Sequence, residues 1–181
     1  MVTFEGRQVV KADGAVAGAG WSTGAPYWAW VGAHGGAGTT SLCEAVPGGA
    51  DFGRHFPEEA GAAGLAAVVV CRSNGRGLAA AREAAAKAAS FGTALLGLVV
   101  VADMPERRRP KPLAEALYLT RGGYEELWEM PWVPAWRFGE PPAPANSPRQ
   151  VRELLVDLWT ALDLPLPGGS SQKTPGGNKT K

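Results

Sequence analysis

Apolar residues occur along the chain in short continuous runs. Residues 28–32 form one such run, and residues 65–71 and 95–102 form two more that are rich in valine and leucine. Continuous apolar runs of this length are typical of strands buried on both faces of a sheet. Residues 126–130, which end before Pro131, are predicted as a fourth strand. The last three runs begin at residues 65, 95 and 126, and this spacing fits strand–helix–strand units.

Helical periodicity fills the gaps between these runs. Residues 78–91 are rich in alanine, and Glu83 and Lys87 stand four residues apart as a favourable helical ion pair. Pro112 is predicted to occupy the first position of a further helix, where a missing backbone N–H is tolerated.

The last predicted helix has the clearest start signal. Ser147 is placed as its N-cap, Pro148 as its first residue and Gln150 as the partner in a capping box. One apolar face follows at helical spacing, formed by Val151, Leu154, Leu155, Leu158 and Leu162. The alternation of strands and helices predicts an α/β fold on a small, mainly parallel sheet of four or five strands.

Changes in composition divide the chain into three segments. Residues 1–26 are predicted to be a flexible N-terminal arm with a short strand at 8–11, and residues 27–164 to be the α/β domain. Residues 165–181 consist mainly of glycine, proline, serine, threonine and lysine. This segment lacks the apolar surface that offsets chain entropy, so we expect a disordered tail.

The charge and cysteine content exclude several functional classes. The chain has 18 basic and 17 acidic residues, so its net charge of +1 provides no overall field to hold nucleic acid or an anionic membrane. Cys43 and Cys71 are too few for a disulfide scaffold, and neither has a partner at zinc-ligand spacing. No apolar run approaches the roughly 20 residues that span a bilayer. We therefore expect a cytoplasmic protein.

The strongest functional signal is a glycine-rich turn after the first predicted strand. Glycines allow backbone N–H groups to converge on an anion, and the start of a helix adds the positive end of its dipole. Hydroxyl residues next to the glycines supply further hydrogen-bond donors. A turn that binds nothing is the alternative. The predicted phosphate-binding residues are Gly35, Gly36, Ala37, Gly38, Thr39, Thr40 and Ser41, with Thr40 also placed to reach Mg²⁺.

This turn resembles the deviant Walker A loop of the ParA/MinD class of P-loop ATPases, whose pattern is Lys-Gly-Gly-x-Gly-Lys-Thr-Thr. The matching positions are Gly35, Gly36, Gly38 and Thr40, the last being the magnesium-binding hydroxyl. The resemblance extends more weakly over residues 28–160 and includes short bacterial P-loop proteins of unknown function. It implies a three-layer P-loop NTPase-like sandwich that binds ATP and Mg²⁺, with a homodimer or another protein as partner.

The resemblance places two further residues near the nucleotide. Asp103 ends the strand predicted at 95–102, and Pro131 begins the loop whose backbone touches the base in the family. Asp103 has three interpretations: a position near the base, a place in a turn, or a metal ligand.

Both lysines of the family pattern are replaced. The signature lysine falls on His34, and the P-loop lysine, which contacts the β- and γ-phosphates, falls on Thr39. Arg54, Arg72 or Arg76 could supply the missing charge. These departures favour an accessory or regulatory protein that binds nucleotide or phosphate with little or no hydrolysis. The alternatives are an interaction module that binds no nucleotide and an active ATPase with a substitute arginine.

The segment after the turn departs from the family as well. A helix that begins at Thr39 is expected to end before Pro47, and residues 50–57 are expected to form a loop where the family has an aspartate-bearing strand. Asp51 in this loop could approach a metal or be solvated.

Tryptophans and prolines gather near the end of the domain. Trp128, Trp132 and Trp136 either form an aromatic shelf for a base or a peptide, with Arg137 on an aromatic face, or fasten this segment to the sheet. Two prolines are expected to exclude a regular helix from residues 130–137. A basic cluster at 107–111 could hold phosphate or be solvated.

Overall fold

The computed structural model describes residues 25–105 and 109–164. Its centre is a five-stranded sheet with the strand order β2-β1-β3-β4-β5, and every adjacent pair is parallel. The strands are β1 (Trp28–Gly32), β2 (Gly49–Asp51), β3 (Ala66–Arg72), β4 (Leu95–Val101) and β5 (Leu127–Met130). The predicted α/β class and small parallel sheet are confirmed. The predicted strand at 8–11 and tail at 165–181 lie outside the described residues, as does nearly all of the predicted arm.

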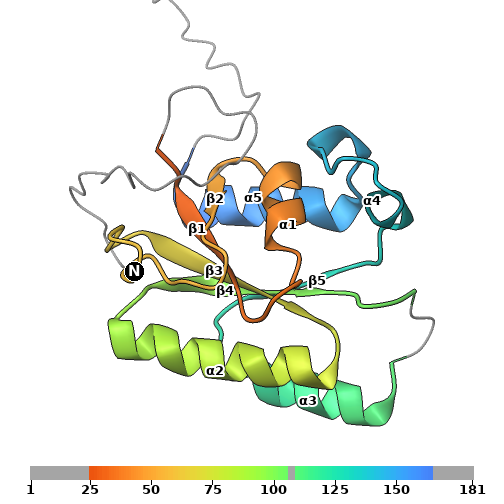
Figure 1. Cartoon of the computed structure of the whole chain (residues 1–181), viewed down its shortest axis with the longest axis horizontal. Helices are drawn as coiled ribbons and strands as arrows, with labels where there is room; N and C mark the ends of the chain where they lie inside the picture. The colour runs from red at the N-terminus through yellow and green to blue at the C-terminus, as the bar shows by residue number, and fades with distance from the viewer. Residues whose placement is uncertain (1–24, 106–108, 165–181) are drawn as a thin grey trace, which may run out of the picture.

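Helices cover both faces of the sheet. Figure 1 shows α2 and α3 on one face, and α1 and α5 on the other. The helices are α1 (Thr39–Ala45), α2 (Gly75–Phe91), α3 (Lys111–Arg121), α4 (Pro134–Arg137) and α5 (Arg149–Ala161), with a 3-10 turn η1 at Pro144–Asn146. Among the residues that the structure describes, no helix is long and apolar enough to cross a membrane.

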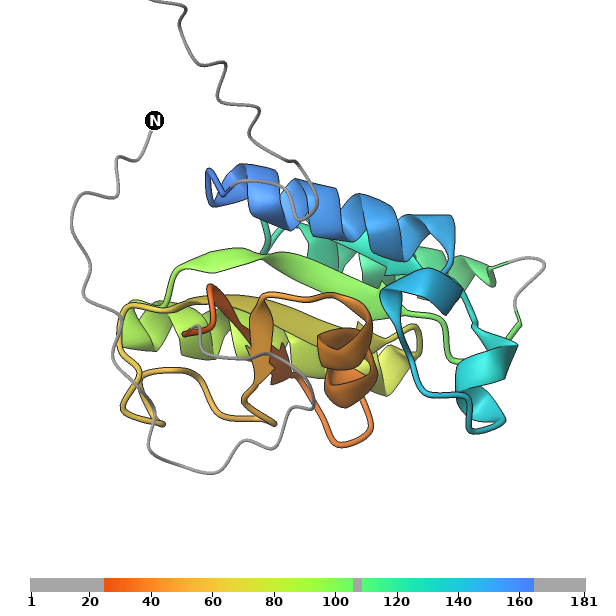
Figure 2. The same ribbon diagram turned by 90° about the horizontal axis from the view of Figure 1, so that it is seen from above.

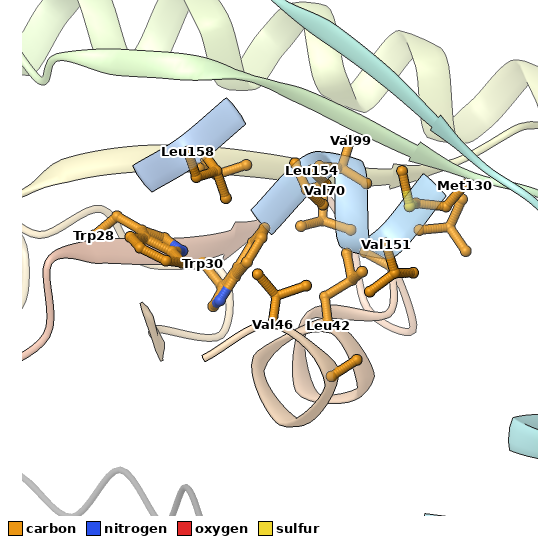
Figure 3. Close-up of a cluster of buried hydrophobic side chains, with 14 of the residues drawn as sticks. Trp28, Trp30, Leu42, Val46, Val70, Val99, Met130, Val151, Leu154 and Leu158 are labelled. Carbon is orange, nitrogen blue, oxygen red and sulfur yellow. The ribbon is translucent and has the colours of Figure 1, made fainter. Parts of the chain in front are cut away.

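Two hydrophobic clusters fill the space between the helices and the sheet. On β3, Val68 and Val70 belong to the cluster under α5, whereas Val69 and Cys71 belong to the cluster under α2. This alternation explains why β3 is apolar from Ala66 to Cys71, because successive side chains point to opposite faces of the sheet. Figure 3 shows Leu154 of α5 beside the side chains of the sheet in the first cluster.

Local contacts change three of the predicted helix starts. Asn74 caps α2, because its side chain accepts a hydrogen bond from the Gly77 N–H at 2.8 Å. The helix α3 begins one residue before Pro112. At α5 the predicted capping box is wrong, since Pro148 is the N-cap and the Ser147 hydroxyl donates to the Ala143 carbonyl instead.

The predicted ion pair within α2 is also wrong. Lys87 pairs with Glu59 at 2.8 Å rather than with Glu83. Glu59 lies in the segment between β2 and β3, so this contact ties α2 to a connecting loop. Sequence spacing within one helix gives no information about such a partner.

The strand β2 and the helix α4 occur where neither was predicted. β2 pairs with β1 along Trp28↔Gly49 and Trp30↔Asp51, so Asp51 ends an edge strand and does not lie in a loop. The helix α4 tolerates Pro134 because this proline occupies its first turn, where no intrahelical N–H bond is required. Both elements are short and carry no periodic signal.

A test of the packing between β1 and β2 uses Gly49→Ala. A Cβ on Gly49 would lie 2.2 Å from Nε1 of Trp28 and 2.5 Å from Nε1 of Trp30, and both tryptophans are fully buried. Overpacking of this kind lowers the free energy of unfolding by about 1–3 kcal/mol. Urea denaturation followed by tryptophan fluorescence measures the change.

The matched control is Gly75→Ala at the start of α2. A Cβ there meets nothing within 4 Å, so we expect a stability equal to wild type or slightly higher. Equal stability of Gly49→Ala and Gly75→Ala would contradict the proposed close approach of β2 to the two tryptophans.

Candidate functional site

The glycine-rich turn connects β1 to α1 at the carboxyl edge of the sheet (Figure 2). Gly36 has φ 75° and Gly38 has φ 108°, and side-chain-bearing residues rarely adopt these values. Gly35 and Gly36 are exposed, and a Cβ on either would meet nothing within 4 Å. Their lack of side chains therefore leaves open space beside the backbone of the turn.

The backbone N–H groups of residues 35–41 are the main unsatisfied donors of this turn. Within the described chain, none of these seven groups donates a hydrogen bond to another residue. The first inward bond after the turn is from the Leu42 N–H to the Gly38 carbonyl at 3.0 Å. Unpaired backbone donors need water or a ligand. The turn therefore offers a run of donors to an acceptor beyond the described residues.

Thr40 and Asp51 lie together beside this turn. The Thr40 hydroxyl donates to Oδ2 of Asp51 at 2.7 Å. The other carboxylate oxygen, Oδ1, accepts the Gly53 N–H at 2.8 Å, and the Gly53 carbonyl accepts the Gly32 N–H at 2.6 Å. These bonds fix the carboxylate against the end of β1. The pairing of β2 with β1 places Asp51 here, which the predicted loop did not show.

His34 braces the turn against β3. Its Nδ1 lies 2.9 Å from the Gly35 carbonyl oxygen, and its Nε2 accepts the backbone N–H of Arg72 at 3.1 Å. Since a carbonyl oxygen only accepts and an N–H only donates, His34 must carry its proton on Nδ1. The residue at the position of the family's signature lysine is therefore a structural contact of the turn.

Arg72, at the end of β3, places its side chain against the same turn. Its Nε donates to the Gly36 carbonyl at 3.0 Å, and its Nη1 donates to the Ala102 carbonyl at 3.3 Å. Its Nη2 would lie 3.6 Å from a Cβ on Gly38. Arg54 and Arg76 are exposed, and neither forms a hydrogen bond with the turn in the described chain. Among the three candidate substitutes for the missing lysines, the structure brings Arg72 to the loop.

The other predicted residues of the turn differ in what their side chains can contribute. Ala37 is buried, with its methyl group in the core beneath α5, so only its backbone can serve a ligand. The hydroxyls of Thr39 and Ser41 form no hydrogen bond within the described part of the chain.

Asp103 and Pro131 form no hydrogen bond with residues 35–41 in the described chain. The backbone N–H of Asp103 donates to Ser73 Oγ at 3.0 Å, and its carboxylate accepts from Asn74 at 3.3 Å, which places it in a turn after β4. Pro131 follows β5 at the sheet edge opposite β2, with β3 and β4 between β5 and β1.

The three tryptophans near the end of the domain have different surroundings. Trp128 donates from Nε1 to Asp157 at 2.8 Å, and Trp128 and Trp136 both pack against the core cluster under α5. Trp132 instead carries Arg137, whose guanidinium carbon lies 4.8 Å from the ring centroid. The segment is thus fastened by two tryptophans, while the third holds a cation on its face.

Other candidate chemistry is weaker. Burial, followed by the nearby charge of Asp51, raises the pKa of Cys43 to about 11, so its thiol is a poor nucleophile at neutral pH. The described residues contain no group of three His, Cys, Asp or Glu side chains that could hold a metal. In the basic cluster, Arg109 forms an ion pair with Glu129, and residues 106–108 lie outside the described chain.

A family model matches residues 26–155, which include the turn, Asp51, Arg72 and Arg137. The chain belongs to DUF6668, a family of unknown function. No curated protein and no solved structure is detectably similar to it. The function of this DUF6668 member therefore has to be argued from its own site.

The contacts of His34 predict one tautomer at neutral pH. We expect the neutral ring to carry its proton on Nδ1, because Nε2 accepts from Arg72. Long-range ¹⁵N–¹H correlation spectra of the imidazole distinguish the two tautomers, with His34→Gln providing the assignment. Predominance of the Nε2–H form would contradict the brace between the turn and β3.

Proposed function

We propose that this DUF6668 member is a degenerate P-loop protein that binds an ATP-like nucleotide with Mg²⁺ at residues 35–41. The supporting observation is the run of seven N–H groups that have no partner among the described residues, beside the Thr40–Asp51 pair. In this proposal the helices and the parallel sheet form a three-layer P-loop NTPase-like sandwich of the ParA/MinD type. Phosphate oxygens accept hydrogen bonds from converging backbone N–H groups, which a glycine-rich turn can present without side-chain obstruction.

The Thr40–Asp51 pair supplies the chemistry that Mg²⁺ requires. Mg²⁺ takes oxygen ligands and is commonly held by one or two carboxylates together with substrate phosphates and water. P-loop NTPases use a loop hydroxyl and an aspartate for this purpose. Thr40 and Asp51 provide one hydroxyl and one carboxylate within 2.7 Å of each other. These residues fit the cation, which would neutralise phosphate charge when bound.

The same site supports binding more strongly than hydrolysis. Neither His34 nor Thr39 brings the fixed charge that the family's lysines place at the phosphates. We therefore propose little or no turnover and an accessory or regulatory role. Bound nucleotide would then act as a conformational or dimerisation signal, as the ParA/MinD resemblance implies.

Isothermal titration with ATP, with and without Mg²⁺, tests this function through two substitutions. Thr40→Val removes the hydroxyl and keeps the shape of the side chain, whereas Asp51→Asn removes the charge. We expect each to abolish the strengthening of ATP binding by Mg²⁺, which corresponds to at least a tenfold weaker Kd in the presence of Mg²⁺. A parallel assay of phosphate release measures turnover.

Thr160→Val is the matched control, because Thr160 is exposed on α5 and its hydroxyl bonds only within the helix. It should bind as wild type does. No heat or thermal stabilisation at millimolar ATP would overturn the proposal and favour an interaction module without nucleotide. Phosphate release that is lost in Thr40→Val would favour the active ATPase.

A further inference from the structure

The phosphates of a nucleotide bring several negative charges, yet the turn itself contains no lysine or arginine. Backbone donors and one Mg²⁺ leave part of this charge unbalanced. In the described chain, the cations that could balance it must therefore come from other elements. Two arginines from different elements meet this condition.

Arg72 is the inner of the two. Its Nε and Nη1 are held by the carbonyls of Gly36 and Ala102, so the position of the guanidinium is fixed relative to the turn. Neither bond neutralises its charge, because a carbonyl group is uncharged. A planar guanidinium held in this way keeps further donors for an anion.

Arg137 is the outer one. It ends α4, lies over Trp132 and is exposed to solvent. Figure 2 shows α4 beyond the same end of the sheet as the turn between β1 and α1. The aromatic face holds the guanidinium without supplying a negative charge.

The charge of Arg137 reaches the guanidinium of Arg72 and acts on its pKa. Burial lowers the pKa of Arg72, the charge of Arg137 lowers it further, and Asp103 partly opposes both effects. Within the described residues, neither arginine forms an ion pair with a carboxylate. Asp103 is itself held by Ser73 and Asn74.

Like charges repel each other, and a polyanion bound between two guanidinium groups would relieve this repulsion. We propose that Arg72 and Arg137 form a two-arginine clamp that holds the phosphate chain of the nucleotide on the turn at residues 35–41. The clamp replaces the two lysines that the turn lacks. This inference rests on the proposed nucleotide site and adds the residues that set its preference for multiply charged ligands.

The clamp determines which phosphate compounds bind. A chain of two or three phosphates carries enough charge and length to contact both the turn and the arginines, whereas a single phosphate group does not. We expect ATP and inorganic tripolyphosphate to bind at least tenfold more tightly than AMP. The preference should not depend on the base.

The test measures Kd for ATP and for tripolyphosphate in wild type and in three charge-matched variants. Arg72→Gln and Arg137→Gln remove one arm of the clamp each, and we expect each to weaken both ligands about tenfold or more. Arg121→Gln is the control, since Arg121 ends α3, the helix that leads into the amino-terminal end of β5. It should leave both Kd values unchanged.

Two further variants, Arg72→Lys and Arg137→Lys, separate the effect of charge on binding from effects on folding. Arg137 is exposed, so Arg137→Gln should unfold at the wild-type temperature. If the loss of the carbonyl contacts destabilises Arg72→Gln, Arg72→Lys is measured as well, because it keeps the positive charge at this position. Arg137→Lys should recover most of the lost affinity, because it retains a cation near Trp132.

The outcomes distinguish this inference from the function on which it rests. ATP binding that is weakened by Arg72→Gln and Arg137→Gln, but not by Arg121→Gln, supports the clamp. Wild-type ATP binding that neither substitution affects overturns the clamp and leaves the nucleotide site in place. Failure of wild type to bind both ATP and tripolyphosphate overturns the nucleotide site and the clamp together.

Discussion

Parallel pairing of all five strands brings their carboxyl ends to one edge of the sheet, and the candidate site is built from residues at or after those ends. The glycine-rich turn comes after β1, Asp51 ends β2 and Arg72 ends β3, while Arg137 is reached through the segment after β5. Residues far apart in the chain therefore lie at the same edge of the sheet. Ligands of open α/β sheets commonly bind at this edge for the same reason.

Close packing around β1 supports the position of the turn. Gly49 lets the edge strand β2 pass directly against Trp28 and Trp30, and this pairing brings Asp51 to Thr40. On the other side of β1, His34 connects the turn to the end of β3. The turn is thus held from both neighbouring strands, while the N–H groups of residues 35–41 have no partner within the described part of the chain.

The parallel sheet and its longer helices could be predicted from sequence, because continuous valine-rich runs and helical periodicity are strong signals. The three-residue strand β2 could not, since nothing in residues 49–51 is apolar enough to indicate a strand. In the sequence, Asp51 is a candidate metal ligand only because it is a carboxylate near the turn. Its contact with Thr40 depends on a pairing that local sequence does not encode.

Local sequence likewise does not show which arginine lies near the turn. Sequence identifies three candidate arginines after the turn without a reason to prefer one, and it indicates Arg137 only as a partner for an aromatic ring. The structure distinguishes Arg72 because its guanidinium bonds to the turn at Gly36. The end of β3 reaches the turn because the spatial order of the strands places β3 directly beside β1.

We propose that the N–H groups of residues 35–41 hold phosphate, and amide NMR tests this directly. In ¹H–¹⁵N spectra of the ¹⁵N-labelled chain, titration with ATP and Mg²⁺ should shift the seven amide resonances of this turn most. Amides at the amino-terminal edge of the sheet, such as those of Leu95 and Leu127, should shift least. Unchanged turn resonances at saturating ATP, or shifts centred elsewhere, would contradict the account.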